Sequence, residues 1–323
     1  MIRRSNLQSG WHRRLRPSLS TLPVFAAVLV AAGLLVFEPN FYRPDNLHIV
    51  MQQFAVLGLV TLGQLLVLLV GGIDLSVGAV MNASLIVIAL MNQHRGQLAA
   101  SLIACLAVGA AVGLANGLLV ALRDVPPFAA TLGMTAVVQG AILVYTKGIP
   151  AGNIPDSLRP IALSGFGIVP YSFMICLCIA TVLWFLLRRG TFGRRIYAVG
   201  RSAEVARRSA ISTTGVRVTA YVLCGLLAAL AGIILSAYVG YVDPRIGGDY
   251  NLQSIAAAVL GGVAFTGGEG SVIGALVGVL FLLVLLNIVT LSSLNPFTQL
   301  IVQGVVVLVA LSAFQVMKHR TTD

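Results

Sequence analysis

Long apolar runs separated by short polar segments dominate this chain and decide what it can fold into. Ten such runs occur, at about 22–37, 49–70, 73–91, 98–122, 128–146, 168–187, 218–240, 252–265, 272–291 and 299–315. A helix of about 20 apolar residues crosses the hydrocarbon core of a bilayer. Only 10% of the 323 residues are charged, against roughly 25% in a soluble domain. We therefore expect an all-α protein, a polytopic transmembrane helical bundle of about ten spans.

The basic residues indicate the orientation of these spans. Of the 21 Lys and Arg residues, most lie before residue 20, in the loop 188–217 or in the C-terminal tail. If the chain starts in the cytoplasm, ten spans leave 16 basic residues in cytoplasmic segments and five outside, as the positive-inside rule requires. We expect both termini in the cytoplasm and the chain in a lipid bilayer. This distribution argues against a nucleic-acid partner, despite the net charge of +11.

The same pattern predicts how the chain is divided. Residues 1–20 form a basic cytoplasmic segment, followed by an uncleaved first span. Residues 21–317 form a single transmembrane domain that contains the long cytoplasmic loop 188–217, and residues 318–323 form a cytoplasmic tail.

The middle of the long loop predicts a short helix. Ser202 is a suitable N-cap for the helix-forming residues up to Ile211. Ala203, Ala206 and Ala210 would share one small-residue face. Either the loop is a positively charged stop that fixes topology, or this face docks in a groove of a cytoplasmic partner.

Two glycine-rich turns are expected on the cytoplasmic side. The first contains Gly71, Gly72, Asp74, Ser76 and Gly78, and the second contains Gly267 and Gly268. Their similar order of Gly-Gly, acidic residue, Ser and Gly-Ala indicates a weak internal repeat. Neither turn is a phosphate-binding loop, because no Gly-Lys-Ser or Gly-Lys-Thr occurs in the chain.

Polar groups within the apolar runs allow two interpretations. Asp74 is either an ion-coupling carboxylate or, as we favour, an acid at the interfacial start of a helix. The mid-span amides either bond neighbouring helices or line a neutral path for an uncharged, hydroxylated solute. The path candidates are Asn82, Asn116, Gln139, Asn287 and Gln303.

The reactive residue types predict no enzyme chemistry. The four cysteines lie inside apolar runs, and the four histidines, at 12, 48, 94 and 319, lie at ends or in loops. They form no metal-binding or nucleophilic constellation. We expect no catalytic residue, no metal and no cofactor.

Several motifs, in order over about 47–310, resemble the ribose-type permease subunits of bacterial ABC sugar importers. They are Gly71-Gly-Ile-Asp-Leu-Ser-Val-Gly-Ala79, Asn116-Gly117, Pro127-Phe-Ala-Ala-Thr-Leu-Gly133, Ala198-Val-Gly200, Ala206-Arg-Arg-Ser209, Tyr221-x3-Gly225-x2-Ala228-Ala-Leu-Ala-Gly232 and Ile255-Ala-Ala-Ala-Val-Leu-Gly-Gly262.

This resemblance implies a permease for a monosaccharide, such as a ribose-like pentose, a hexose or a related polyol. It implies a homo- or heterodimer with a second permease subunit, two separate ABC ATPase subunits and a periplasmic sugar-binding protein. By the same similarity, residues 198–211 are the coupling helix that the ATPase receives. The residues expected in this role are Gly200, Arg201, Ser202, Glu204, Ala206, Arg207 and Ser209.

The chain departs from the family pattern at three places: Arg201-Ser202 replaces Gly-Asn, Ser209-Ala-Ile211 replaces Ser-Gly-Ile, and Tyr250-Asn-Leu252 replaces Tyr-Glu-Leu. Two other functions stay open. One is an ion-coupled secondary sugar carrier that uses Asp74, and the other is an ABC permease for a non-sugar solute such as branched-chain amino acids.

Overall fold

A computed structural model describes residues 39–92, 97–149, 152–243 and 245–291, with single positions beyond residue 291. The predicted span 22–37 and most of the predicted span 299–315 lie outside the described residues. So do the segment 1–20, the tail 318–323 and Gln303.

Helices form most of the described chain, as the sequence predicts. A short 3-10 helix, η1 (Pro39–Tyr42), precedes them. The helices are α2 (Pro44–Leu69), α3 (Val77–Met91), α4 (Leu98–Leu122), α5 (Pro127–Thr146), α6 (Arg159–Leu163), α7 (Tyr171–Arg189), α8 (Thr191–Arg201), α9 (Ala203–Arg208), α10 (Thr213–Val239), α11 (Tyr250–Leu260) and α12 (Val272–Leu291). The all-α prediction misses one antiparallel hairpin between α6 and α7, formed by β1 (Gly165–Phe166) and β2 (Val169–Pro170).

Six of the described helices are long and apolar enough to cross a membrane: α2, α4, α5, α7, α10 and α12. The apolar runs at 73–91 and 252–265 do not form full spans. They form α3, with 15 residues, and α11, with 11 residues. At about 1.5 Å per residue, neither helix covers a hydrocarbon core of about 30 Å. In both runs the helix stops short because part of the run is extended or turn backbone.

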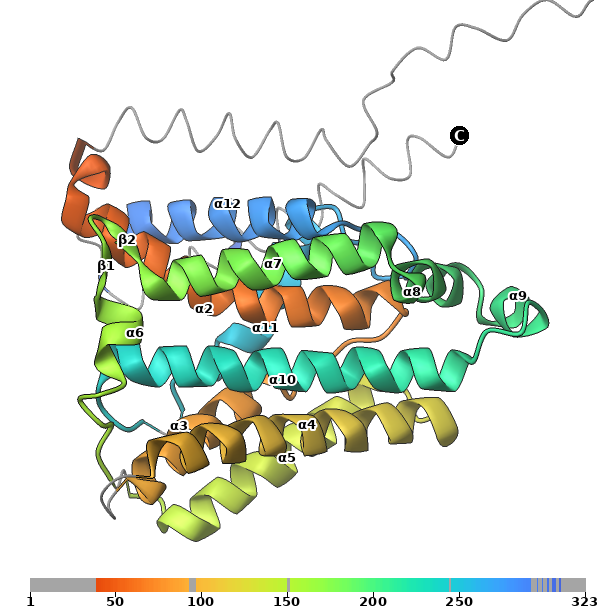
Figure 1. Ribbon diagram of the computed structural model, residues 1–323, viewed down its shortest axis with the longest axis horizontal. Helices are drawn as coiled ribbons and strands as arrows, with labels where there is room; N and C mark the ends of the chain where they lie inside the picture. Colours follow the sequence, from red (N-terminus) through yellow and green to blue (C-terminus); the bar gives the residue numbers. More distant parts are fainter. Residues whose placement is uncertain are drawn as a thin grey trace, which may run out of the picture.

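The centre of the bundle is α2, of which 94% is buried over its apolar window. It lies between α10 on one side and α7 and α12 on the other (Figure 1). By contrast, α4, α5 and α7 are only 22%, 17% and 28% buried. Their outer faces expose apolar side chains such as Val144 and Phe185, which suits contact with lipid tails.

The two ends of the bundle differ. At one end, α8 lies across the ends of the long helices and α9 projects beyond them; we name this the α9 end (Figure 1). At the opposite end lie α6 and the β1–β2 hairpin; we name this the α6 end (Figure 1). The helix α2 runs toward the α9 end, whereas α10 starts there and runs back (Figure 1).

An internal repeat relates α2, α3 and α4 to α10, α11 and α12. A shift of 169 positions (213 − 44) places Pro44 on Thr213, Met91 on Leu260 and Leu122 on Leu291. The same shift places Gly71, with φ of 76°, on Gly240, with φ of 74°. Each of these glycines ends a long helix in the left-handed backbone region, which strains other residues. Because α2 and α10 run in opposite directions, the repeat is inverted, as in many transporters.

This repeat corrects the one predicted from the sequence. Gly71-Gly72 and Gly267-Gly268 do not occupy equivalent places, since Gly71 corresponds to Gly240. The two glycine turns nevertheless lie in contact at the α9 end.

Candidate functional site

The loop between α7 and α10 folds into the two helices α8 and α9. One face of α8 is buried through Gly193, Ile196 and Val199, while Arg194 and Arg195 are exposed. A helix with one apolar and one charged face is stable when it lies against the end of the bundle.

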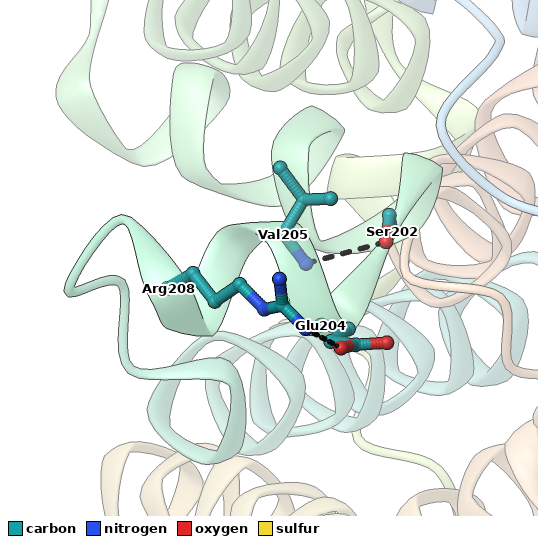
Figure 2. A network of polar contacts seen from close by, with 4 residues as sticks. All are labelled: Ser202, Glu204, Val205 and Arg208. Carbon is teal, nitrogen blue, oxygen red and sulfur yellow. Dashed lines mark hydrogen bonds and ion pairs between the residues drawn. The ribbon is translucent and has the colours of Figure 1, made fainter.

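The short helix α9 starts as the sequence predicts. The Ser202 hydroxyl accepts a hydrogen bond from the backbone N–H of Val205 at 3.3 Å, which satisfies one free donor of the first turn. One turn along, the Arg208 guanidinium pairs with the Glu204 carboxylate on the exposed side (Figure 2). The cap and the ion pair hold six residues in a helix that would be too short to persist alone.

Of the predicted small-residue face, only Ala206 is buried, whereas Ala203 is half-buried and Ala210 is exposed beyond the end of α9. Ala206 is only 2% exposed and belongs to the hydrophobic core, so it attaches α9 to its own chain. Val205 is 62% exposed and is flanked by exposed Glu204, Arg207 and Arg208. In this conformation the exposed side of α9 therefore carries one apolar side chain among charged ones, while Ala206 packs against the rest of the chain.

Three chain segments meet at the α9 end in what we name the glycine junction: Leu69, Gly71, Gly200, Gly267 and Gly268. The backbone N–H of Gly268 donates to the Leu69 carbonyl oxygen at 2.9 Å. A Cβ atom on Gly200 would overlap that oxygen and the Gly268 nitrogen. A Cβ atom on Gly267 would lie 2.9 Å from both the Gly71 nitrogen and the Gly200 oxygen. The end of α2, the end of α8 and the turn before α12 therefore touch backbone to backbone.

A second contact joins α8 to that turn. The Tyr197 hydroxyl donates to the Gly270 carbonyl oxygen at 2.8 Å. Burial raises the pKa of the Tyr197 phenol above its ordinary value of 10.0, so the group remains a neutral donor at physiological pH.

Asp74 lies in the non-helical segment between α2 and α3. The Asp74 carboxylate accepts hydrogen bonds from the Ser76 backbone N–H at 2.8 Å and from the Ser76 hydroxyl at 2.6 Å. The Asn116 amide donates to the same hydroxyl at 2.9 Å. Asp74 lies two residues before Ser76, the N-cap of α3, so it is neither the predicted N-cap nor a first-turn acid, and it is 1% exposed.

The extended backbone around Asp74 is satisfied by side chains from other helices. With its amide nitrogen facing the Asp74 carbonyl oxygen, Gln64 donates at 3.0 Å and accepts from the Asp74 N–H at 3.2 Å. Thr131 donates to the Ile73 carbonyl oxygen, and Thr135 to that of Leu75. Non-helical backbone persists at membrane depth only where protein groups pair with it in this way.

The two short helices meet at their N-termini through two matching bonds. The Gly247 N–H donates to the Asn82 side-chain oxygen at 2.7 Å, and the Gly78 N–H donates to the Asn251 side-chain oxygen at 2.6 Å. Gly78 and Asn82, like Gly247 and Asn251, are four positions apart. We name these four residues the crossing. Sequence reasoning missed Asn251, although the repeated Gly-x3-Asn spacing was a signal for it.

The structure does not gather the predicted path amides in one place. Asn82 belongs to the crossing and donates to Gln139 at 3.4 Å, whereas Asn116 bonds near Asp74. Asn287 pairs with Asn46 near the α6 end, each amide donating to the other at 2.9 Å. Each of these amides bonds a neighbouring segment of the chain.

A cleft of about 190 Å³ opens at the α9 end beside the glycine junction. Its lining residues come from the ends of α2 and α4 and the starts of α5 and α10: Val70, Gly71, Gly72, Val120, Asp124, Val125, Pro126, Pro127, Arg217 and Tyr221. Among the described residues, no three His, Cys, Asp or Glu side chains gather as a metal site.

Comparison with known proteins assigns the fold to a family. The family model described as "Branched-chain amino acid transport system / permease component" matches residues 46–311. The chain belongs to this permease family. Together with the relatives given below, this match confirms the resemblance to ribose-type import permeases. The permease is a multi-pass protein of the inner membrane.

Curated relatives of the permease are named as import permeases, among them permeases for the sugars ribose and fructose. The ribose import permease of Bacillus subtilis (strain 168) is 36% identical over 303 residues, covering 93% of this chain and 92% of the relative. The fructose import permease of Rhizobium meliloti is 33% identical, covering 93% and 85%. The autoinducer 2 import system permease of Enterobacter sp. (strain 638) is 33% identical, covering 89% and 84%. No solved structure matches the permease significantly.

Proposed function

We propose that this permease is the membrane-spanning subunit of an ATP-driven ABC importer that moves a monosaccharide across the inner membrane. The substrate class is a ribose-like pentose, a hexose or a related polyol, as in the relatives named ribose and fructose import permeases. Hydrolysis of ATP takes place on separate ATPase subunits. A periplasmic sugar-binding protein delivers the solute, and a second permease subunit, identical or related, completes the pore.

One observation carries this proposal: the glycine junction. A push or pull on α9 reaches α8 through Ser202, and α8 touches both the end of α2 and the turn before α12. Packed backbone without intervening side chains transmits displacement with little slack. Movement of α9 by an ATPase thus shifts the central helix and the second repeat together, which is what alternating access requires.

The topology in this proposal has ten membrane passes, with α3 and α11 completing two of them together with their extended segments. The α9 end is cytoplasmic and the α6 end is periplasmic, since Arg188, Arg189, Arg194, Arg195 and further arginines lie at the α9 end. The basic segment 1–20 and the tail 318–323 are then cytoplasmic too, flanking one permease domain at 21–317.

The residues of the coupling loop divide into two roles. Arg201, Glu204, Val205, Arg207 and Ser209 are exposed and contact the ATPase. Gly200, Ser202 and Ala206 hold α9 on the permease. A neutral solute passes a path to which Asn82 and Gln139 contribute polar atoms, with Asn116 and Asn287 supporting the helices around it.

The first test is co-purification of the tagged chain with its ATPase from native membranes in mild detergent. Val205→Asp places a charge in the exposed apolar position of α9, and we expect the ATPase to be lost while membrane insertion persists. Thr191→Asp adds the same charge at the exposed start of α8 and serves as the control. Retention of the ATPase by Val205→Asp would refute the assignment of α9.

The second test separates the substrate classes. The permease with its ATPase, reconstituted in vesicles and supplied with a binding protein, is offered labelled ribose, fructose or leucine. The proposal expects ATP-dependent uptake of a sugar. Uptake of leucine instead would support the branched-chain amino acid function given in the description of the family model. Sugar uptake without ATP, driven by a proton or sodium gradient, would support the secondary-carrier alternative.

A further inference from the structure

Four arginines at the α9 end have no part in the role proposed for α9. They are Arg188 and Arg189 in the last turn of α7 and Arg194 and Arg195 on α8, and all four are exposed. We name them the arginine collar. Among the described residues, the ion pairs join Arg159 to Asp156 and Arg208 to Glu204, so no collar guanidinium pairs with a carboxylate there.

The collar begins where the apolar outer face of α7 ends. Val182 and Phe185 are 54% and 59% exposed on that face. Arg189 follows Phe185 by four positions and therefore lies on the same side of the helix. The Arg188 guanidinium lies over the Trp184 ring, 5.2 Å from its centre. Tryptophan is enriched at the level of lipid headgroups, so this stretch of α7 marks the boundary between lipid tails and headgroups.

The start of α8 adds the other two arginines to this boundary. The Arg194 side chain donates to the Arg189 carbonyl oxygen at 3.4 Å, which holds the two helices' arginines close together. The buried face of α8, with Ile196 and Val199, and the Tyr197 bond to Gly270 fix how the helix lies. In contrast, α9 projects farther from the bundle and carries Glu204 among its arginines (Figure 1).

We propose that the arginine collar binds the headgroups of anionic phospholipids in the cytoplasmic leaflet. Guanidinium groups match phosphate oxygens with two parallel hydrogen bonds. Basic clusters just beyond a membrane span attract anionic headgroups within a Debye length. The collar has the charge, the height in the membrane and the fixed geometry for this ligand. Bound lipid then braces α8, through which α9 acts on the glycine junction.

Native mass spectrometry of the purified full-length chain tests this proposal. The protein is released from micelles that contain equal amounts of phosphatidylglycerol and phosphatidylcholine, and the retained lipids are counted. We expect preferential retention of phosphatidylglycerol. Arg194→Gln with Arg195→Gln should lower that preference at least about tenfold, since each arginine near the surface contributes about a factor of five.

The matched control is Arg207→Gln with Arg208→Gln, which removes the same charge from α9. It should change the lipid preference by less than about twofold, because α9 lies beyond the headgroups. Arg194→Lys with Arg195→Lys keeps the charge and should retain most of the preference. Thermal unfolding of each variant checks that the fold is intact.

Three results would overturn the proposal. One is the absence of a preference for phosphatidylglycerol in the unmodified chain. Another is an equal loss of preference in the α9 control. The third is an unchanged lipid preference in Arg194→Gln with Arg195→Gln together with loss of the ATPase, which would assign the collar to an acidic protein surface. Because lipid retention is measured without transport, these results are independent of the proposed sugar-import function.

Discussion

The side-chain amides of Asn46 and Asn287 face each other and each donates a hydrogen bond to the other at 2.9 Å. The pair joins the start of α2 to the last turns of α12, near the α6 end. Asn46 also donates to the Phe41 carbonyl oxygen at 3.0 Å, which extends the contact to η1. Two amides that satisfy each other inside an apolar region are worth more together than either is alone.

The first prediction follows from this pair. Replacing Asn287 by Ala should lower the free energy of unfolding by about 1 to 2 kcal/mol, because Asn46 loses a partner in apolar surroundings. Thermal unfolding in detergent measures the effect, and Thr290→Ala, at an exposed position of α12, is the control. In the double variant with Asn46→Ala, the loss should be smaller than the sum of the single losses. Additive losses would show that the pair contributes little.

The second prediction concerns the glycine junction. Gly268 has φ of 73°, and a Cβ atom there would lie 2.8 Å from the Arg201 nitrogen. Gly268→Ala should strain the turn by about 1 to 2 kcal/mol and push α8 from α2. We expect ATP-driven uptake to fall at least about tenfold, while the chain still inserts in the membrane. Gly133→Ala adds the same methyl group in open space on α5 and should leave uptake intact. Normal uptake by Gly268→Ala would mean that the junction transmits no motion.

The third prediction separates the charge of Asp74 from its hydrogen bonds. Asn at this position still accepts from the Ser76 N–H and hydroxyl, so Asp74→Asn should keep the start of α3 and change uptake by less than about threefold. Asp74→Leu removes both acceptors and should lower stability by about 1 to 3 kcal/mol. Uptake assays and thermal unfolding measure the two effects. A folded Asp74→Asn variant without uptake would support ion coupling through the carboxylate.

The fourth prediction addresses α9. Ser202→Ala removes the acceptor for the Val205 N–H, and the expected cost is about 1 kcal/mol for loss of an N-cap. Hydrogen exchange at residues 203–208 should accelerate roughly fivefold, whereas exchange in α10 should not change. Ser212→Ala removes the corresponding cap of α10, which accepts from Gly215 at 3.2 Å. As the matched control, it should accelerate exchange at the start of α10 and leave exchange at residues 203–208 unchanged. Equal exchange at 203–208 in Ser202→Ala and the parent would show that packing of Ala206 alone holds α9.

Hydropathy predicted the bundle well where a helix spans the membrane without a break. The runs 98–122 and 272–291 coincide with α4 and α12, because nothing within them competes with helix. Ser202 was predicted as a cap from its residue type and from the helix formers that follow it, both local properties. The permease family could be recognised from short motifs in a fixed order, because such motifs can be identified even where the rest of the sequence differs.

Features set by distant contacts escaped prediction. The run 73–91 is apolar from Leu85 to Met91, and its non-helical start depends on Gln64 and Thr131 from other helices. Similarly, the buried side of α9 is decided by which neighbour Ala206 meets. The predicted repeat was wrong because it rested on similar residue types in two glycine turns, whereas the repeat in the structure relates helix ends and backbone angles.

The crossing has a consequence for how the protein is made. The Asn82 side chain accepts from Gly247, which follows it by 165 positions in the chain. A ribosome that adds about 5 to 20 residues per second needs roughly ten to thirty seconds to synthesise that length. Until then, the Gly78 N–H and the Asn82 side-chain oxygen lack the partners that they have in the folded chain. Synthesis of residues 247–251 supplies both missing partners at once. The second repeat therefore completes the folding of the first. A pause or truncation before residue 247 leaves a nascent chain that is apolar enough to insert in the membrane but cannot form the two hydrogen bonds of the crossing.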